Sequence, residues 1–582
     1  MTRSGTDAAG VAMPKARSRG KAVWIIALMA LIACGVQLFN IQIVRGAELA
    51  EQGRIVRTSA LPVDAPRGSI VDADGQVLVD TVKTYHVAVR QQVIPEFRNY
   101  EDGKLVGTGP AEAARLLAPI LERDPSELGG ELVGDSQYQY LAKNVDLQTA
   151  REIRSLNIYG IELEPSFERQ YPAGTTAATV VGTVDYEGNG SSGLELTFND
   201  LLTGVPGEEA YEIGPTGARM PGAKVTTKEA VPGATLHTSI HSDLQYSIQE
   251  LLDQSVAQWG AEWGSVVIMD VATSRILVLA DSFERSPLEG PQPSATVQNL
   301  YEPGSVGKVL TFATALQKGT ITPTTRYSVP ATIDIGDQNF HDYYSDHPTY
   351  DLTATGVLAM SSNTGTIQVG MTVSDEDRYQ TFLDFGLGQS TGVELPGETA
   401  GMLGAPDSWD GRTKFANMFG QGVGVNVLQT TAIGAVIGND GVWNAPHLVD
   451  GWTTADGIYH QKETAKPREA LSPEVAKTLR TMMESVVVDE IGTGQLAAVE
   501  GYRIAAKTGT AEVAGGGIVP SIMGIVPADD PQIVITAMLY KPSNTLPEGN
   551  TVGPLFSASV AEAVRMLDIP PSGEPARLFP SE

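Results

Sequence analysis

A run of 23 residues without a charged side chain, AVWIIALMALIACGVQLFNIQIV (22–44), restricts this chain more than any other feature. As an α-helix it reaches about 34 Å, at roughly 1.5 Å per residue, which is enough to cross a bilayer. Residues 1–21 carry five basic side chains and one acidic side chain, and basic flanks stay on the cytoplasmic side. We therefore expect a single-pass cell-membrane anchor, a cytoplasmic tail and a body outside.

Two alternatives to a permanent anchor stay open. A cleaved signal peptide has a shorter apolar stretch and a small-residue cleavage site. Leu31-Ile-Ala-Cys34 is similar to a bacterial lipoprotein box, with the only cysteine of the chain at the position that is lipidated. The apolar run continues to Val44, however, which favours the anchor. A single cysteine excludes an internal disulfide, so a hydrophobic core has to hold the exported body together.

The charge of the body excludes one class of partner. The formal net charge is −29 at pH 7, and because the first 21 residues contribute +4, the remainder carries −33. A nucleic-acid-binding surface needs a basic footprint, so we expect no nucleic-acid partner. A chain of 582 residues with 42% hydrophobic and 19% charged residues is typical of a globular protein with two or more domains.

Two domains are expected after the anchor. Residues 45–235 contain short strand patterns, including a hairpin at 66–81 around Asp72-Ala-Asp-Gly75, and no catalytic cluster, which indicates a scaffold. Residues 236–570 follow the order helix, strands, helical middle, strands, which predicts an antiparallel sheet with helices on its faces. The fold class is therefore α+β. The last residues, 571–582, are expected to form a frayed tail.

The second domain contains a serine–lysine pair at the start of a predicted helix. Ser305 follows the Pro303-Gly304 break, and Lys308 lies one turn further on the same helix face. A serine hydroxyl needs a base to become a nucleophile. Lysine can be that base only when neutral, so its pKa must fall from about 10.4 to near 7. Burial, a second cation and the helix dipole all act in that direction.

A Ser-x-x-Lys match alone is weak, because residues 18–21 form another. A strand predicted at 505–513, AAKTGTAEV, supplies the second cation in Lys507. Gly509 allows a ligand backbone to lie close, and Thr508 and Thr510 offer hydroxyls. A strand with an open edge can bind a peptide by adding it to the sheet.

Ser361 and Asn363, in MSSNTGT (360–366), can relay a proton and hydrogen-bond an amide. The order Ser-x-x-Lys, Ser-x-Asn, Lys-Thr-Gly, with separations of 56 and 146 residues, resembles the penicillin-binding proteins and serine β-lactamases. The stretches PRGSIVDADGQVL, ERQYPAG, YEPGSVGK and FGQGVGVNVLQTTAIGAVIGNDGV extend the resemblance along nearly the whole chain, to class B penicillin-binding proteins. Gly307 is unusual for that family.

The resemblance implies a non-catalytic, strand-rich, elongated pedestal, of the dimerisation type, followed by a D,D-transpeptidase domain. This enzyme would cross-link peptidoglycan stem peptides through an acyl-serine intermediate and would bind β-lactams. Ser305 would be the nucleophile, Lys308 its base, Ser361 the proton carrier and Asn363 a ligand of the substrate amide. Lys507, Thr508 and Thr510 would hold the terminal carboxylate, and the backbone N–H groups of Ser305 and Thr510 would form the oxyanion hole. No cofactor and no metal are needed.

Within the family, the short pedestal and residues 341–366 are most similar to the division-septum member of actinobacteria. An elongation-type relative is the alternative. No glycan polymerase site is evident in the sequence, so the expected partners are a membrane glycan polymerase and other division proteins. Gln37, Asn40 and Gln42 in the anchor are polar side chains of the kind that favour packing against another membrane helix.

Other interpretations stay open. A class A β-lactamase needs a glutamate in a Glu-x-x-x-Asn stretch after the Ser-x-Asn motif, and no glutamate after Asn363 has an asparagine four residues on. A carboxypeptidase and a β-lactam sensor would keep the same three motifs. The loop HDYYSDH suggests a metal site, but a polar loop beside the cleft is favoured; its candidate ligands are His341, Asp342, Asp346 and His347. The third residue of the stem peptide, the β-lactam affinities and the oligomeric state stay open.

Overall fold

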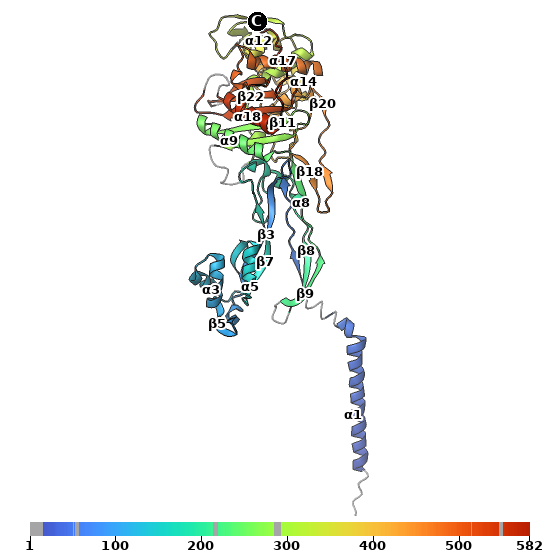
Figure 1. Cartoon of the computed structure of the whole chain (residues 1–582). Helices are drawn as coiled ribbons and strands as arrows, with labels where there is room; N and C mark the ends of the chain where they lie inside the picture. Colours follow the sequence, from blue (N-terminus) through green and yellow to red (C-terminus); the bar gives the residue numbers. More distant parts are fainter. Residues whose placement is uncertain are drawn as a thin grey trace, which may run out of the picture. The chain divides into compact units, whose positions relative to one another are not determined.

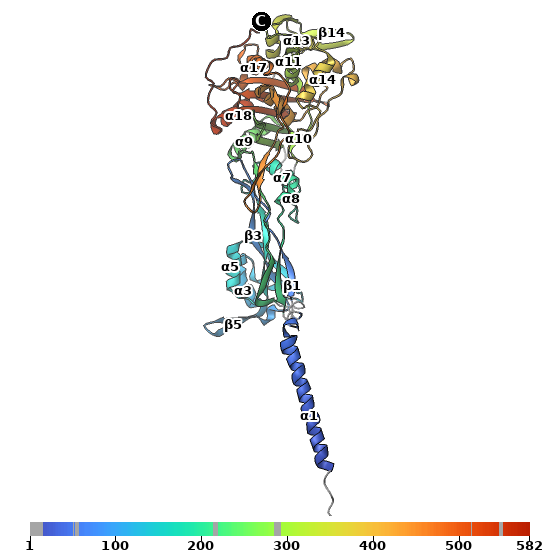
Figure 2. The same ribbon diagram turned by 90° about the vertical axis from the view of Figure 1, so that its right-hand side faces the viewer.

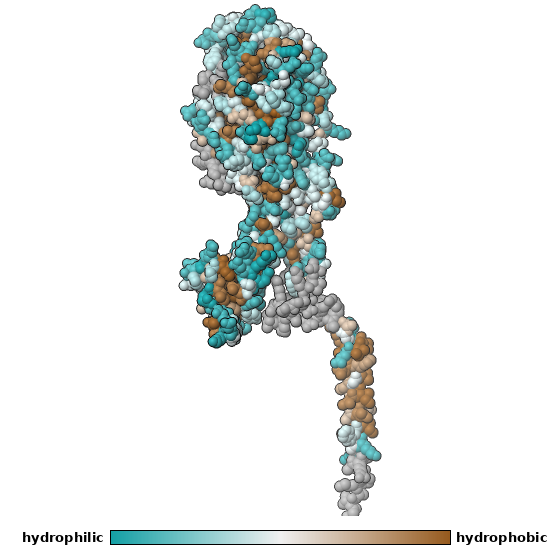
Figure 3. Space-filling view, viewed as in Figure 1, coloured by the Kyte–Doolittle hydropathy of each residue, from teal (hydrophilic) through white to brown (hydrophobic). Residues whose placement is uncertain are grey.

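In the computed structural model of the chain (Figure 1), the apolar run forms a helix. Helix α1 (Lys15–Phe39) continues into the π-helical turn η1 (Asn40–Val44). The segment Arg19–Val44 has 26 residues and a mean hydropathy of 2.4, and its side chains are not buried inside the protein. Figure 3 shows the hydrophobic surface of α1. Length and composition therefore fit a membrane span, and Cys34 is exposed on it.

The structure describes residues 15–49, 52, 58–213, 219–283, 293–513, 515–545 and 551–582. Most of the expected cytoplasmic tail, residues 1–14, lies outside these ranges. Contacts divide the chain into one unit of residues 1–65 and 205–231 and another of residues 66–204 and 232–582. The smaller unit contains a three-stranded antiparallel sheet in the order β1-β8-β9. Its strands are β1 (Thr58–Val63), β8 (Gly207–Ile213) and β9 (Arg219–Lys228).

The larger unit begins with the predicted hairpin of β2 (Ile70–Val71) and β3 (Val77–Val89). The Asp72 carboxylate accepts hydrogen bonds from the backbone N–H groups of Asp74 and Gln76, which fixes the turn. Strand β3 pairs along its length with β7 (Ile161–Gln170).

A seven-stranded sheet joins distant parts of the sequence. Its order is β19-β18-β10-β2-β3-β6, with β7 also paired to β3. The helices α3, α4 and α5 contribute to a separate hydrophobic core beside β3, which includes Val87, Leu117, Leu128 and Ile153. The further elements of this part are η2 (Ile94–Glu96), β4 (Arg98–Glu101), β5 (Lys104–Thr108), α3 (Gly109–Leu121), α4 (Pro125–Glu131), β6 (Gln139–Val145), α5 (Leu147–Ser155), α6 (Ala178–Val181), α7 (Gly193–Thr197), α8 (Asn199–Leu202), β10 (Thr235–Thr238), β18 (Val449–Thr453) and β19 (Tyr459–Gln461).

The predicted antiparallel sheet is present, with five strands in the order β12-β11-β23-β22-β21. The strands are β11 (Trp263–Asp270), β12 (Ile276–Phe283), β21 (Ala505–Glu512), β22 (Ile518–Val526) and β23 (Ile533–Tyr540). Alternate residues of each strand face opposite sides. Val266 and Ile268 belong to a core formed with α9 (Ser242–Trp259) and α18 (Gly553–Met566).

On the opposite face, Val267 and Met269 belong to the core that contains α11 (Lys308–Gln317), α16 (Val427–Gly438) and α17 (Pro473–Val488). Figure 2 shows these helical layers around the sheet. The remaining elements are α10 (Ala295–Gln298), η4 (Gly304–Gly307), β13 (Arg326–Val329), β14 (Thr332–Ile335), β15 (Gln338–His341), β16 (Tyr350–Thr353), α12 (Ala354–Ala359), α13 (Asn363–Gly370), α14 (Asp375–Asp384), η5 (Pro406–Ser408), α15 (Thr413–Ala416), η6 (Asn417–Phe419), β17 (Val442–Trp443), β20 (Arg468–Glu469) and η7 (Gln495–Ala497).

The expectation that residues 571–582 fray is wrong. Thr353, at the start of α12, donates its backbone N–H to the carbonyl of Ser581 at 3.0 Å and its hydroxyl to the carbonyl of Pro580 at 2.6 Å. The Ser581 hydroxyl donates to Asp489. A Cβ atom on Gly356 would lie 1.9 Å from the Ser581 carbonyl oxygen, so the tail packs directly on α12.

We predict that the effect of Gly356→Ala on thermal stability depends on whether the C-terminal tail is present. In the full chain the added methyl displaces Ser581, so the unfolding temperature falls. In a chain that ends at Phe579 the clash with Ser581 is absent, and alanine in a helix is favoured over glycine by about 1 kcal/mol, so the same substitution should be neutral or stabilising. Thermal unfolding of the four proteins measures this, and an equal change in both backgrounds would contradict the docked tail.

Candidate active site

Ser305 lies in a tight turn that close backbone packing defines. It belongs to the 3-10 turn η4, and α11 begins three residues later at Lys308. The Gly304 N–H donates to the Gly420 carbonyl at 3.0 Å, and a Cβ on Gly307 would lie 2.7 Å from the Gly420 Cα. A side chain at position 307 would therefore separate the two segments. This close approach explains the glycine that is unusual for the resembled family.

Lys308 is fully buried beside the Ser-x-Asn motif. Its Nζ donates to the Ser361 carbonyl and lies 3.2 Å from the Ser361 Oγ. Burial lowers the pKa of Lys308 to about 7, and the negative charge of Asp342 acts in the opposite direction. A substantial fraction of Lys308 is therefore neutral at neutral pH and can accept a proton, as a base for the neighbouring serine must.

Lys507 reaches the same hydroxyl from the edge of the sheet. Its Nζ donates to the Ser361 Oγ at 2.8 Å and to the Thr508 carbonyl at 3.0 Å. Strand β21 is the last strand in the sheet order. The structure thus brings all three motifs together, with the Ser361 hydroxyl between the two lysine amines.

Several of the predicted site residues line one cleft of about 580 Å³, whereas Lys308, Lys507 and Gly509 are not among its lining residues. Ser305, Asn363, Thr508 and Thr510 line it, together with Ser361. The Asn363 side-chain amide donates to the His341 carbonyl at 2.9 Å, and the Thr508 hydroxyl lies 2.6 Å from that of Thr493. The cleft therefore presents hydroxyl and amide groups beside two lysines, which suits a peptide with a terminal carboxylate.

Close packing explains why position 509 is a glycine. A Cβ at this position would lie 3.0 Å from the Pro303 carbonyl oxygen and 2.5 Å from the Ser521 Oγ. The missing side chain therefore lets β21 lie against the turn that carries Ser305. As a result, Thr510 and Ser305 are held on adjacent backbone segments.

Sequence reasoning missed the role of two further groups at this site. Asp342, considered only as a metal ligand, is buried beneath the Ser-x-Asn turn and accepts hydrogen bonds from Ser362 and from two backbone N–H groups. Thr493 lies between α17 and β21 and contacts Thr508. The polar composition of loop 341–347 draws attention to Asp342 in the sequence, whereas no sequence motif indicates a role for Thr493. Among the residues that the structure describes, no three His, Cys, Asp or Glu side chains are arranged to hold a metal ion.

Two family descriptions match parts of the chain. The family described as "Penicillin binding protein transpeptidase domain" matches residues 264–561, and "Penicillin-binding Protein dimerisation domain" matches residues 62–238. The chain is 32% identical over 587 residues to penicillin-binding protein PbpB of Mycolicibacterium smegmatis, covering 94% of this chain and 90% of that protein.

Two further similarities agree with these matches. The chain is 28% identical over 546 residues to peptidoglycan D,D-transpeptidase FtsI of Escherichia coli K12, covering 91% of this chain and 89% of that protein. Its structure is similar to the crystal structure of penicillin-binding protein 3 of Mycobacterium tuberculosis complexed with aztreonam. The TM-score is 0.69 at 27% identity, over 90% of this chain and 100% of that chain.

We predict that acylation of Ser305 by a fluorescent penicillin follows the ionisation of Lys308. Protonated Lys308 cannot accept the serine proton, so the second-order rate constant rises with pH through about 7 and levels off above it. Stopped-flow measurements between about pH 5 and about pH 9 provide the profile.

Two variants control for this assignment. Lys308→Arg keeps a cation that cannot be neutral in this range, and Lys308→Ala removes the base, so neither is expected to be acylated. A flat pH profile, or acylation of Lys308→Ala at the wild-type rate, would show that another group activates Ser305.

Proposed function

Because the chain belongs to the class B penicillin-binding proteins, we propose that it is a peptidoglycan D,D-transpeptidase with Ser305 as its nucleophile, acting in septal wall synthesis during cell division. One observation carries the assignment of the site: the Ser361 hydroxyl lies between the amines of Lys308 and Lys507, beside the turn that holds Ser305. Each motif of the serine–lysine mechanism is therefore in contact with another.

The reaction that this geometry supports has two steps. In acylation, the Ser305 Oγ attacks the carbonyl carbon of the penultimate D-Ala, and neutral Lys308 takes the hydroxyl proton. The peptide C–N bond breaks, and the terminal D-Ala leaves after its nitrogen receives a proton through Lys308 and Ser361. In the second step, the amine of another stem peptide attacks the ester, forms the cross-link and releases the Ser305 hydroxyl.

The remaining residues bind the substrate. We assign the terminal carboxylate to Lys507 and to the hydroxyls of Thr508 and Thr510. The backbone N–H groups of Ser305 and Thr510 stabilise the oxyanion, because donors aimed at the developing charge lower the barrier. The open edge of β21 can pair with the stem peptide as an added strand, and Gly509 keeps that strand close to Ser305. Asn363 binds the substrate amide, and no cofactor takes part.

The proposal extends to the organisation of the chain. We assign residues 1–21 to the cytoplasm, 22–44 to the membrane, 45–235 to the pedestal and 236–570 to the transpeptidase domain outside the membrane. The division-specific partner that we propose is a membrane glycan polymerase, because cross-linking is useful beside newly made strands. Polar Gln37, Asn40 and Gln42 support contact between this anchor and another membrane helix.

We predict that penicillin acylates Ser305 and no other residue. Intact-mass and peptide mass spectrometry should find one adduct on the wild-type protein and none on Ser305→Ala. Since no Glu-x-x-x-Asn stretch follows Asn363, the acyl-enzyme should hydrolyse slowly. An adduct that survives in Ser305→Ala would contradict the assignment of Ser305 as the nucleophile. Rapid β-lactam turnover would favour a hydrolase.

We also predict that the anchor contributes to partnership and not to catalysis. Residues 22–44 are replaced by an unrelated apolar helix of equal length with the same flanking charges. Septal placement and co-purification with the polymerase should be lost while penicillin acylation is preserved. If placement, division and co-purification all persist, the segment serves only as an anchor.

A further inference from the structure

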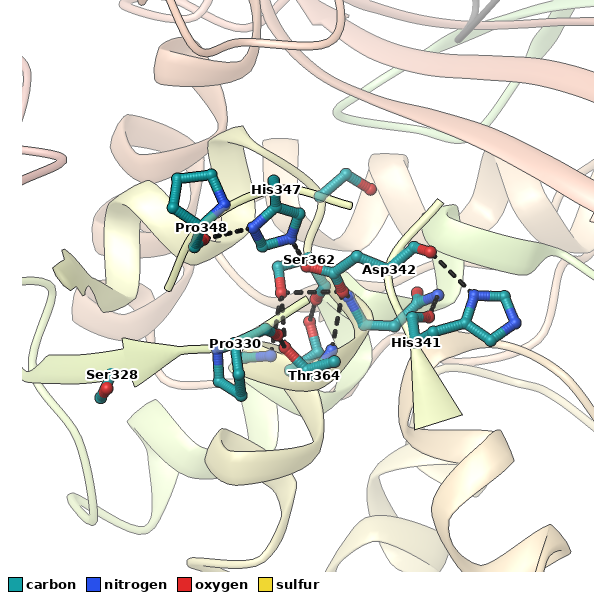
Figure 4. A network of polar contacts seen from close by, with 12 residues as sticks. Ser328, Pro330, His341, Asp342, His347, Pro348, Ser362 and Thr364 are labelled. Atoms are coloured by element: carbon teal, nitrogen blue, oxygen red, sulfur yellow. Dashed lines mark hydrogen bonds and ion pairs between the residues drawn. The ribbon is translucent and has the colours of Figure 1, made fainter. Parts of the chain in front are cut away.

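A buried carboxylate holds the turn that carries Ser361. Asp342 is 3% exposed, and its Oδ1 accepts from the Ser362 hydroxyl at 3.0 Å, from the Asn363 N–H at 2.6 Å and from the Thr364 N–H at 2.9 Å. Figure 4 shows Asp342 between His347 and the segment that contains Ser362 and Thr364. One oxygen atom therefore fixes three consecutive residues directly after Ser361.

Ser361 needs such support because its backbone is strained. Its φ is +60°, in the left-handed region, which costs a residue with a Cβ atom roughly 1–2 kcal/mol. Conformations of this kind persist where the surroundings determine them. In this conformation Ser361 presents both its carbonyl and its hydroxyl to the Lys308 Nζ. The contacts of Asp342 thus act on the geometry of the two catalytic groups.

The second oxygen of Asp342 is paired with His347. The distance from His347 Nε2 to Asp342 Oδ2 is 3.1 Å, and the two side chains are 8% and 5% exposed. His347 Nδ1 lies 2.6 Å from the Pro348 carbonyl oxygen, and the ring stacks on Tyr350 at 4.8 Å between centroids. Contacts at both ring nitrogens and on the ring face therefore hold His347 in one orientation against Asp342.

Charge links this pair to Lys308 as well. The Asp342 carboxylate opposes the lowering of the Lys308 pKa by burial. From β21, Lys507 faces the same site through the Ser361 hydroxyl, and Arg412 and Glu512 line the cleft. Asp342 is therefore placed to influence both where the Lys308 amine lies and how readily it holds a proton.

We propose that Asp342, oriented by His347, is a positioning residue for acylation at Ser305, and that it acts through the Ser361 turn and through its charge on Lys308. This inference rests on the proposed function, because it concerns the same serine–lysine site. It adds residues outside the three motifs and assigns the polar loop 341–347 a role in the reaction.

The experiment measures penicillin acylation as a function of pH for the full-length protein and four variants. Asp342→Asn keeps the size of the side chain and removes its charge, so the plateau rate should fall by about 10-fold to 100-fold. With the negative charge gone, the midpoint of the profile should also move to lower pH. Asp342→Glu keeps the charge but changes the reach, so the plateau should fall while the midpoint stays near the wild-type value.

His347→Gln should lower the plateau rate as well. It removes the ring that lies 3.1 Å from the Asp342 Oδ2, so the carboxylate loses its orientation against the Ser361 turn. This variant also tests the positioning role of Asp342 if Asp342→Asn fails to fold. Asp346→Asn is the matched control, because it makes the same chemical change at an exposed position of the same loop, and its profile should match that of the wild type.

The outcomes are distinguishable. A wild-type plateau and midpoint in Asp342→Asn, or a wild-type plateau in His347→Gln, would overturn the inference and leave the proposed function intact. A lower plateau with unchanged midpoints in all variants would reduce Asp342 to a structural role and also overturn it. A wild-type protein that penicillin does not acylate at Ser305 would overturn the proposed function itself, and this inference with it.

Discussion

The burial of one lysine amine is the constraint on which the site depends. Moving the pKa of Lys308 from 10.5 to about 7 corresponds to roughly 5 kcal/mol against the charged form. The fold imposes this penalty on the charged amine by placing α11 in the core beneath the five-stranded sheet, where Lys308 has no exposed surface. A group that would be a cation at the surface is thus partly neutral at neutral pH, as the base that we propose for Ser305 must be. The same burial requires that its few polar partners be positioned accurately.

Those partners come from segments far apart in the sequence. The backbone contact between Gly304 and Gly420 shapes the turn of Ser305, and the missing side chain of Gly509 brings β21 against that turn. Ser361 lies on a third segment, between α12 and α13, and contacts both Lys308 and Lys507. The docked C-terminal residues bind the start of α12 through Thr353. Stability and catalysis are therefore coupled, because the elements that form the core also set the distances at the site.

The sequence predicted the parts of this arrangement that local patterns encode. The anchor, the hairpin around Asp72, the antiparallel sheet and the three motifs each follow from periodicity, turn residues or motif order. The positive φ of Ser361 could not be predicted, because serine has no preference for that region and only tertiary contacts impose it. Asp342 was visible as part of a polar loop, but its hydrogen bonds depend on how the loop folds over α13. The tail from residue 571 onward has a Pro-rich composition typical of disorder. Its docking becomes evident only in the folded structure, where Thr353 donates a hydrogen bond to the carbonyl of Pro580.

The ionisation of Lys308 itself tests the central claim most directly. Protein labelled with [ε-13C]lysine, with the Lys308 signal assigned by its loss in Lys308→Ala, can be titrated by NMR. We predict that this signal titrates near pH 7, because Lys308 is fully buried. A Lys308 signal that stays protonated up to the usual lysine pKa of about 10.4 would contradict it, since Ser305 would then lack its base at neutral pH.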